Sequence, residues 1–373
     1  MRDAEDLVEA ERLMTICNSC RYCEGLCAVF PAMEMRRSFA VGDLNYLANL
    51  CHSCGACYVD CQFSPPHEFN VNVPRTLAKV RGNSYRTYAW PKALQPAFDR
   101  NGLTIALLTV LGVAGFILGF VLAHDPGALA TGSGQFYALM PHRAMAALFG
   151  AAGIYAVVAL GVGFRNFWRD IGAAGLSGWS GSSLWQAVRD AGQLRYLDGG
   201  GVGCYNEDDR PTDNRRLFHH LAFYGFLLCF AATVSGTVYH YLLDWPAPYG
   251  WTTLPKLFGI PGGIGLVVGS IGLLLARTRR DPAMRDQGHR GMDVAFLMMM
   301  FLAGLTGLLL MVLRETPAMG VALAFHLGAI LALFLTMPYG KFVHGLYRFG
   351  ALVLYAAERR TGEAAPIERR ART

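Results

Sequence analysis

The stretches CNSCRYCEGLC, from Cys17 to Cys27, and CHSCGACYVDC, from Cys51 to Cys61, hold eight of the ten cysteines of this 373-residue chain. Both follow the pattern Cys-x2-Cys-x2-Cys-x3-Cys. In proteins with two four-iron clusters, the first three cysteines of such a run bind one cluster and the fourth binds the other. The pattern therefore predicts two [4Fe–4S] clusters.

The expected ligand sets exchange their fourth members. Cluster 1 is predicted to bind Cys17, Cys20, Cys23 and Cys61, and cluster 2 to bind Cys51, Cys54, Cys57 and Cys27. Zinc and disulfides are the alternatives. Structural zinc sites usually pair two short cysteine units across a longer gap, and disulfides need an oxidising compartment, so the spacing and the charge pattern below disfavour both. Outside the runs, Cys229 lies within an apolar stretch and is expected to be a small packing residue, and Cys204 has no predicted partner.

The 23 residues between the two runs indicate a helix. Leu44, Leu47 and Leu50 recur at helical spacing, and Asp43 before them is predicted to be the N-cap. No proline directly follows the last cysteine of either run, which departs from the usual ferredoxin pattern. We therefore expect a helical ferredoxin module. His52 is expected to face solvent; the alternative is a hydrogen bond that tunes a cluster.

The rest of the chain is strongly apolar. Hydrophobic residues make up 53% of the chain and charged residues 16%, against roughly 25% charged residues in soluble domains. Six stretches approach the roughly 20 apolar residues that a helix needs to cross a bilayer. They lie at about 103–123, 144–164, 217–242, 257–276, 293–313 and 320–340. In the fourth, Pro261 and two glycines near the start are residues that can break a helix.

Lysine and arginine are distributed unevenly around these stretches. Of 33 such residues, residues 1–102 hold 11, residues 165–216 hold 7, residues 277–292 hold 5 and the tail after 340 holds 7, whereas each of the other three loops holds one. By the positive-inside rule, this alternation predicts cytoplasmic N- and C-termini in a bacterial inner membrane. The same pattern accounts for the net charge of +6 and gives no argument for nucleic acid. The charged N-terminus contains no apolar core, so we expect no cleaved secretory signal.

The expected fold class is an all-α membrane protein with a bundle of cytochrome b type. Residues 1–61 are predicted to form the two-cluster module, and residues 62–102, rich in proline and aromatic residues, an irregular linker along the membrane surface. Residues 103–348 are predicted to form the six-span bundle with a cytoplasmic loop at 165–216. Residues 349–373 are predicted to be a cytoplasmic tail.

Several histidines fall near the ends of the predicted spans, where ionisable residues are costly and indicate function. His326 and His344 are 18 residues apart, which is five helical turns. Helical geometry predicts two facing pairs in antiparallel helices: His219 with His344 near the cytoplasm, and His240 with His326 near the outer face. Each pair is a candidate set of axial ligands for a b-type haem, giving one or two haems.

Two further histidines, His220 and His142, are alternative haem ligands. The simpler interpretation of all these histidines is that some of them lie at the membrane interface and cap helices. A quinone site is expected at the inner ends of the third and sixth spans, near Arg215, Arg216, His220 and Lys341.

The cytoplasmic loop at 165–216 contains the sequence Gly-Gly-Gly-Val-Gly-Cys, from Gly199 to Cys204. No strand precedes it and no Gly-x-Gly-x-x-Gly helix start follows, so it is not a nucleotide fingerprint. We expect turns with positive φ. The alternative is a docking surface for a partner or a wall near the inner haem.

The motifs in combination resemble those of the tricarballylate/citrate-utilisation protein B family. They comprise the double cysteine run, the Gly199–Cys204 loop, the Arg-Arg-Leu-Phe-His-His segment at 215–220 and Phe-Ala-Ala-Thr at 230–233. The resemblance extends over nearly the whole chain. It implies a protein that reoxidises a flavin dehydrogenase acting on tricarballylate and passes the electrons through iron–sulfur centres and haem to the quinone pool.

The chain contains no flavin or nicotinamide fingerprint and no catalytic dyad, so we expect no catalytic residues of its own for a substrate dehydrogenase. The predicted function is that of an electron conduit with quinone reductase activity, whose partners are a cytoplasmic FAD-dependent dehydrogenase and a membrane quinone. The first alternative is the reverse direction, with quinol oxidised to supply a soluble reductase. The second is a membrane redox sensor.

Overall fold

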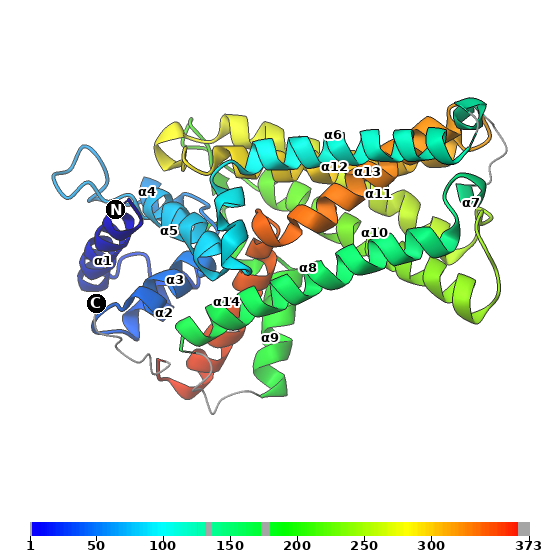
Figure 1. Ribbon diagram of the computed structural model, residues 1–373. Helices are drawn as coiled ribbons and strands as arrows, with labels where there is room; N and C mark the ends of the chain where they lie inside the picture. The colour runs from blue at the N-terminus through cyan, green and yellow to red at the C-terminus, as the bar shows by residue number, and fades with distance from the viewer. Residues whose placement is uncertain (1, 125, 131–135, 173–179, 365–373) are drawn as a thin grey trace.

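The computed structural model describes residues 2–124, 126–130, 136–172 and 180–364. Almost all of these residues are helical or lie in the turns between helices (Figure 1). Within the described part of the chain, the sole sheet consists of two short antiparallel strands, β1 (Cys204–Tyr205) and β2 (Pro211–Thr212). The prediction of a mainly helical protein is therefore confirmed.

The N-terminal module lies at one end of the molecule, on the left in Figure 1. Its helices are α1 (Arg2–Cys20), α2 (Val29–Glu34), α3 (Val41–Leu50), α4 (Ala56–Val59) and α5 (Val73–Tyr88). Helix α5 packs against α1 and α3, so the first part of the predicted linker is an integral part of the module. Pro74 is compatible with this helix because it occupies the first turn, where the missing N–H is not needed.

One expected helix start is wrong in detail. Helix α3 begins at Val41, its N-cap is Ala40, and Asp43 is the third helical residue. The Asp43 carboxylate accepts the backbone N–H of Ala40 at 2.9 Å. Asp43 therefore satisfies a free N–H group at the helix start from inside the helix, in the manner of a capping box.

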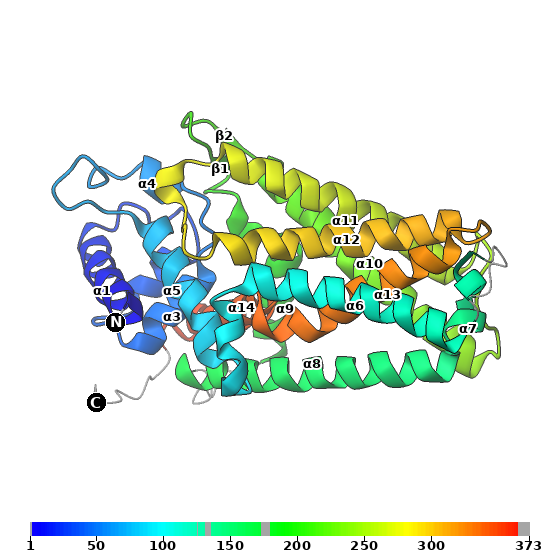
Figure 2. The ribbon, with the colours of Figure 1, turned by 45° about the horizontal axis from the view of Figure 1, so that its top comes forward.

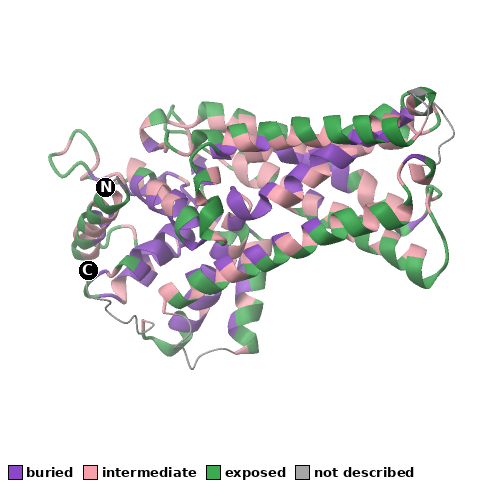
Figure 3. Ribbon diagram, viewed as in Figure 1, coloured by how far each residue is buried: buried purple, intermediate pink, exposed green. Residues whose placement is uncertain are grey.

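Among the residues that the structure describes, six helices are long and apolar enough to cross a membrane, and they lie where the sequence predicts them (Figure 2). They are α6 (Asn101–Ala123), α8 (His142–Asp170), α10 (Asn214–Leu242), α11 (Leu254–Arg279), α12 (Arg290–Leu313) and α13 (Met319–Thr336). Helix α11 continues through Pro261 without a break. Large apolar side chains such as Leu122, Val157 and Val312 are exposed on the outside of the bundle, as expected of surfaces that contact lipid (Figure 3).

The connections between these helices are short or helical. The described part of the chain also contains α7 (Phe136–Leu139), α9 (Gly181–Gly192) and the 3-10 turns η1 (Lys92–Phe98), η2 (Pro126–Ala130), η4 (Arg195–Leu197), η5 (Pro282–Met284) and η6 (Met337–Tyr339).

Glycines allow α10 and α11 to approach closely. A Cβ atom added at Gly225 would lie 2.8 Å from the backbone nitrogen of Leu266, and one at Gly269 would lie 2.5 Å from that of Ala222. No real side chain fits at such distances, so the two helices contact each other through their backbones. This is the usual role of small residues between membrane helices.

The predicted tail differs from the structure. Helix α14 (Val343–Thr361) covers much of it and packs against α3, α9 and α8. The Tyr347 ring stacks on Phe167 of α8 at 4.8 Å between centroids and meets Tyr88 of α5 edge to face at 5.8 Å. These aromatic contacts join the module to the inner end of the bundle.

A buried ionic network fixes α14 to the module. Arg36 Nη2 donates to Glu358 Oε1 at 2.6 Å, and Arg36 Nε donates to Asp43 Oδ1 at 2.5 Å. The Tyr46 hydroxyl donates to the other Glu358 oxygen at 2.8 Å. Burial alone would lower the pKa of Arg36. The Glu358 carboxylate, together with Tyr46 and Asp43, has the larger effect and raises the pKa of Arg36 overall. Arg36 therefore stays charged, with both charges of the pair compensated.

Replacing Glu358 with Gln is expected to destabilise the module, because it leaves the buried Arg36 charge with Asp43 as its remaining anionic partner. Loss of one member of a buried pair costs about 3–5 kcal/mol. The measurement is the unfolding temperature of the detergent-solubilised protein. Glu363→Gln, at an exposed position beyond α14, is the matched control. Equal unfolding temperatures for the two variants would show that the network does not hold the helix.

Candidate metal centres

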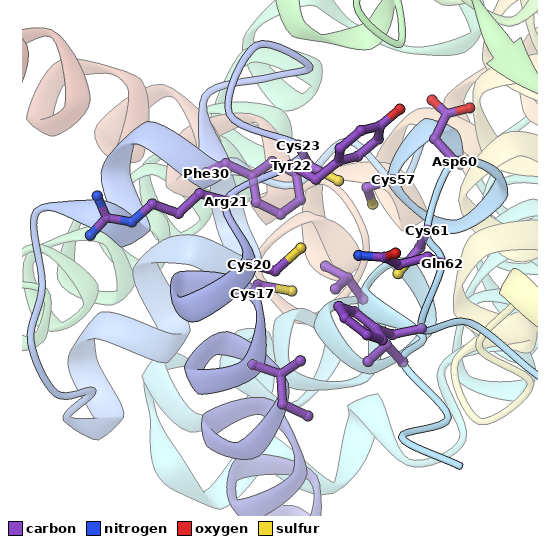
Figure 4. Close-up of a pocket in the computed structure, with 14 residues that line it drawn as sticks. Cys17, Cys20, Arg21, Tyr22, Cys23, Phe30, Cys57, Asp60, Cys61 and Gln62 are labelled. Carbon is purple, nitrogen blue, oxygen red and sulfur yellow. The ribbon is translucent and has the colours of Figure 1, made fainter. Parts of the chain in front are cut away.

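Five cysteines line a cavity of about 230 Å³ at the outer edge of the module: Cys17, Cys20, Cys23, Cys57 and Cys61 (Figure 4). Cys17 and Cys20 come from the end of α1, and Cys23 from the turn that follows it. Cys57 lies within α4 and Cys61 follows it, and the thiols of Cys23, Cys61 and Cys20 act electrostatically on that of Cys17. The structure thus brings the fourth cysteine of the second run to the first three of the first run. We call this the outer cysteine site.

The second group consists of Cys27, Cys51, Cys54 and Cys57. The thiols of Cys54 and Cys51 act electrostatically on that of Cys27, and all three act on that of Cys57. They line a smaller cavity of about 20 Å³. We call this the inner cysteine site. Cys57 also neighbours Cys23 of the outer cysteine site, so the two sites adjoin.

The grouped thiols are unfavourable as thiolates without a cation. Burial, and then the neighbouring thiols, raise the pKa of Cys17 and of Cys23 to about 12. A metal centre reverses this effect, because cysteine binds metals as thiolate and the bound cation stabilises that form. The donor set therefore fits a thiolate-bound metal cluster. As the side chains stand, the described residues contain no three His, Cys, Asp or Glu groups that converge on one metal ion.

The backbone around Cys51 is held in an unusual conformation. Ser53 has φ of +51° and Gly55 has φ of +97°. The Ser53 N–H donates to Cys51 Sγ at 3.3 Å. A side chain at Gly55 would collide with Met284 Sδ at 2.9 Å. Glycine is therefore required where the loop turns into α4.

The glycine loop covers the inner cysteine site. Gly199, Gly200, Gly201 and Gly203 all have positive φ, which confirms the predicted turns. A Cβ atom at Gly203 would lie 2.6 Å from the carbonyl oxygen of Thr212 on β2. Beyond the loop, the backbone N–H of Tyr205 donates to the Cys54 carbonyl at 2.9 Å. Cys204, for which no partner was predicted, is buried and packs against Cys54.

Arginines contact the carbonyls of the segment that carries Cys51. Arg81 Nη1 and Arg348 Nη2 both donate to the Cys51 carbonyl, at 2.6 and 2.7 Å. Arg215 donates to the carbonyls of His52 and Ser53, at 3.0 and 2.8 Å. Sequence reasoning treated Arg81 and Arg348 only as part of the positive-inside count. Their helical positions gave no sign that they turn inward.

The two arginines predicted together have different surroundings. Arg215 reaches the inner cysteine site, whereas Arg216 lies 3.8 Å from the exposed carboxylate of Asp213. The expectation for His52 is wrong: its side chain is buried, and its Nδ1 lies 3.0 Å from the Leu50 carbonyl. Burial and the neighbouring Arg348 hold the pKa of His52 well below its usual range, so its ring is neutral.

His219 and His344 face each other at the inner end of the bundle. Their ring centroids are 6.2 Å apart and their planes are nearly perpendicular. Two imidazoles bound to one metal at about 2 Å each have centroids roughly 6 Å apart, so an ion fits between them. His344 Nδ1 lies 2.5 Å from the Lys341 carbonyl, to which it can only donate, and this leaves Nε2 with a free lone pair. His219 Nδ1 is buried without a hydrogen-bond partner.

The outer histidines are arranged differently from the prediction. The ring stacked on His240 is that of His142, at 3.6 Å between centroids. His326 instead lies with its Nδ1 3.0 Å from the Thr306 hydroxyl. The reason is that α10 packs along α11, whereas α13 packs along α6 and α12. The alternative ligand His220 stacks on Tyr224 of its own helix.

Comparison with known proteins agrees with this architecture. The family described as "Citrate utilization protein B" matches residues 97–365, and the family described as "Citrate utilization protein B Fer4-like domain" matches residues 10–87. The second range includes α5, in agreement with its place in the module. No solved structure matches the chain.

A curated protein from Escherichia coli with the name "Citrate utilization protein B" is 46% identical over 369 residues, covering 97% of this chain and 95% of its own length. Because both family descriptions and this relative together cover almost the whole sequence, the chain belongs to the citrate utilization protein B family.

Proposed function

We propose that this protein carries electrons from a soluble flavin-dependent dehydrogenase to a quinone in the membrane. Two [4Fe–4S] clusters would bind at the two cysteine sites: cluster 1 at the outer cysteine site, with Cys61 as its fourth ligand, and cluster 2 at the inner cysteine site, with Cys27. A b-type haem would bind between His219 and His344. These groups supply one-electron chemistry when bound, and the chain supplies their ligands, spacing and surroundings.

The observation that carries this proposal is the unbroken succession of sites from the surface to the bundle. The outer cysteine site adjoins the inner one through Cys57. The segment after Cys51 continues into the buried His52, which neighbours His219. His219 in turn faces His344. Each site is therefore next to the following one, as a one-electron path requires.

The position of the outer cysteine site supports a soluble electron donor. Its cavity is lined by residues of α1, which lies at the end of the molecule away from the bundle (Figure 1), and Tyr22 beside it is 72% exposed. With the module on the cytoplasmic side, as the lysine and arginine distribution predicts, the donor is a cytoplasmic FAD-dependent dehydrogenase. The relative's name and the sequence motifs support a tricarboxylate of the tricarballylate type as that enzyme's substrate.

The quinone would bind near the inner ends of α10 and α13. Lys341 lies there, paired with Asp293 at 2.7 Å, and Asp293 also binds Arg277 at 2.5 Å. Reduction of a quinone takes up protons as well as electrons, and this ionic group lies beside His344 through the Lys341 carbonyl. At the other end of the bundle, the His142 and His240 rings are stacked at 3.6 Å between centroids, so a second haem between them would require the two rings to separate.

The first prediction concerns the cofactors. Anaerobically purified protein is expected to contain iron and acid-labile sulfide in the amounts per chain that two four-iron clusters require. After dithionite reduction it is expected to show the sharp absorption bands of a bis-histidine haem. The measurements are chemical analysis and oxidised-minus-reduced spectra. Zinc in place of iron would overturn the cluster assignment, and clusters without haem bands would overturn the histidine assignment.

The exchange of the fourth cysteines can be tested by comparing serine variants in pairs. Cys17→Ser and Cys61→Ser are expected to change the same electron paramagnetic resonance signal, because both remove a ligand of cluster 1. Cys51→Ser and Cys27→Ser are expected to change the other signal. If Cys61→Ser instead altered the signal that Cys51→Ser alters, each run would bind its own cluster.

His219→Ala is expected to remove about one haem per chain, because it removes one of two axial ligands. His220→Ala is the matched control, because the neighbouring His220 ring stacks on Tyr224 of its own helix. The readout is haem content per cluster iron. For the outer pair, His240→Ala and His142→Ala should lower haem content if a second haem is present, and His326→Ala should not; a loss with His326→Ala alone would restore the original pairing.

A further inference from the structure

Positive charge is concentrated at one of the two cysteine sites. Four arginines from separate parts of the chain gather beside the segment that carries Cys51. They are Arg81 on α5, Arg215 on α10, Arg280 after α11 and Arg348 on α14, and we call them the arginine cage. Arg81, Arg215 and Arg348 donate to backbone carbonyls of residues 49–53. Arg280 donates to the Met284 carbonyl and has no partner for its buried Nε.

The cage is crowded with like charge. Burial, and then the nearby Arg215, lower the pKa of Arg280 to about 9. Burial, and then Arg81, lower the pKa of Arg348 to about 10. Asp293, a carboxylate whose charge acts on Arg81, is already paired with Arg277 and Lys341. Such a group of cations is favourable only beside an anion. A cluster bound by the thiolates of the inner cysteine site would supply that negative charge.

The outer cysteine site has no comparable cage among the residues that line it. Arg21 and Asp60 lie on its wall with opposite charges. The Arg21 side chain points away from the cysteines (Figure 4), and its Nε donates to the Asn18 carbonyl at 3.1 Å. The two sites therefore share the same ligands but differ in the fixed charge around them.

We propose that the arginine cage holds the reduction potential of cluster 2 above that of cluster 1. A cluster gains one negative charge on reduction, so nearby fixed cations stabilise its reduced form. Water at the more open outer site also stabilises the reduced form of cluster 1. The cage outweighs it, because three of its guanidiniums contact the ligand segment itself in a largely buried region.

This inference rests on the proposed function and gives its step between the clusters a direction. One electron passes from the outer to the inner cysteine site, so cluster 1 is oxidised as cluster 2 is reduced, and no bond or proton is exchanged. The reductant is the reduced flavin of the partner enzyme, and the final oxidant is the quinone. With this order of potentials the step from cluster 1 to cluster 2 is downhill, and the potentials of the flavin and the quinone set the net direction of the whole path.

The test is a redox titration of the complete protein in detergent, followed by electron paramagnetic resonance. Cys20→Ser and Cys54→Ser assign the two signals to their sites. In the unmodified protein, cluster 2 is expected to be reduced at the higher potential. Arg280→Gln should lower the potential of cluster 2 and leave cluster 1 unchanged. Its hydrogen bond goes to its own loop, so the ligand segment keeps its other contacts.

Two controls separate charge from structure. Arg280→Lys keeps the charge and should keep the potential of cluster 2. Arg86→Gln, on the same helix as Arg81 but paired with Asp99 on the exposed surface, should shift neither cluster. Reduction of cluster 1 before cluster 2 in the unmodified protein would overturn the inference, as would an unchanged cluster 2 in Arg280→Gln. If the protein held no iron–sulfur clusters, the proposed function itself would fail.

Discussion

The buried pair between Arg36 and Glu358 determines how the two halves of this molecule are assembled. It joins the segment just after α2 to α14, the last described helix, which itself follows directly from the bundle. Helix α14 brings Arg348 to the Cys51 carbonyl, and His344 at its start faces His219. One helix, fixed at its far end by an ionic contact, thus connects the inner cysteine site to the inner histidines.

Local patterns in the sequence predicted the elements of this fold well. The six apolar stretches correspond to the six long helices, because the length and composition of a membrane span are properties of the stretch itself. Helix α5 and the position of α14 were not predictable in this way. Prolines before and after α5 resemble a linker, and α14 is amphipathic and carries charged residues at its end. What they pack against depends on the tertiary structure.

For the candidate sites, spacing along the chain was informative within a segment and less so between helices. The first three cysteines of each run are close in sequence and therefore meet locally, whereas Cys61 and Cys27 come to those groups from the other run. His219 and His344 could be paired from the sequence because both lie near the same end of the predicted bundle, and their rings contact each other in the structure. The pairing of His240 depends on which helix lies beside α10 at its outer end. The glycine contacts hold α11 against one side of α10, and the ring stacked on His240 is His142 at the start of α8.

Those glycine contacts also limit how a lipid-soluble molecule can enter the bundle. At Gly225 and Gly269 the backbones of α10 and α11 touch, with no side chain between them that could rotate aside. A flat ring with an isoprenoid chain therefore has no passage from the bilayer through this side. The contact between α10 and α11 therefore closes one side of the bundle along its length near these two glycines.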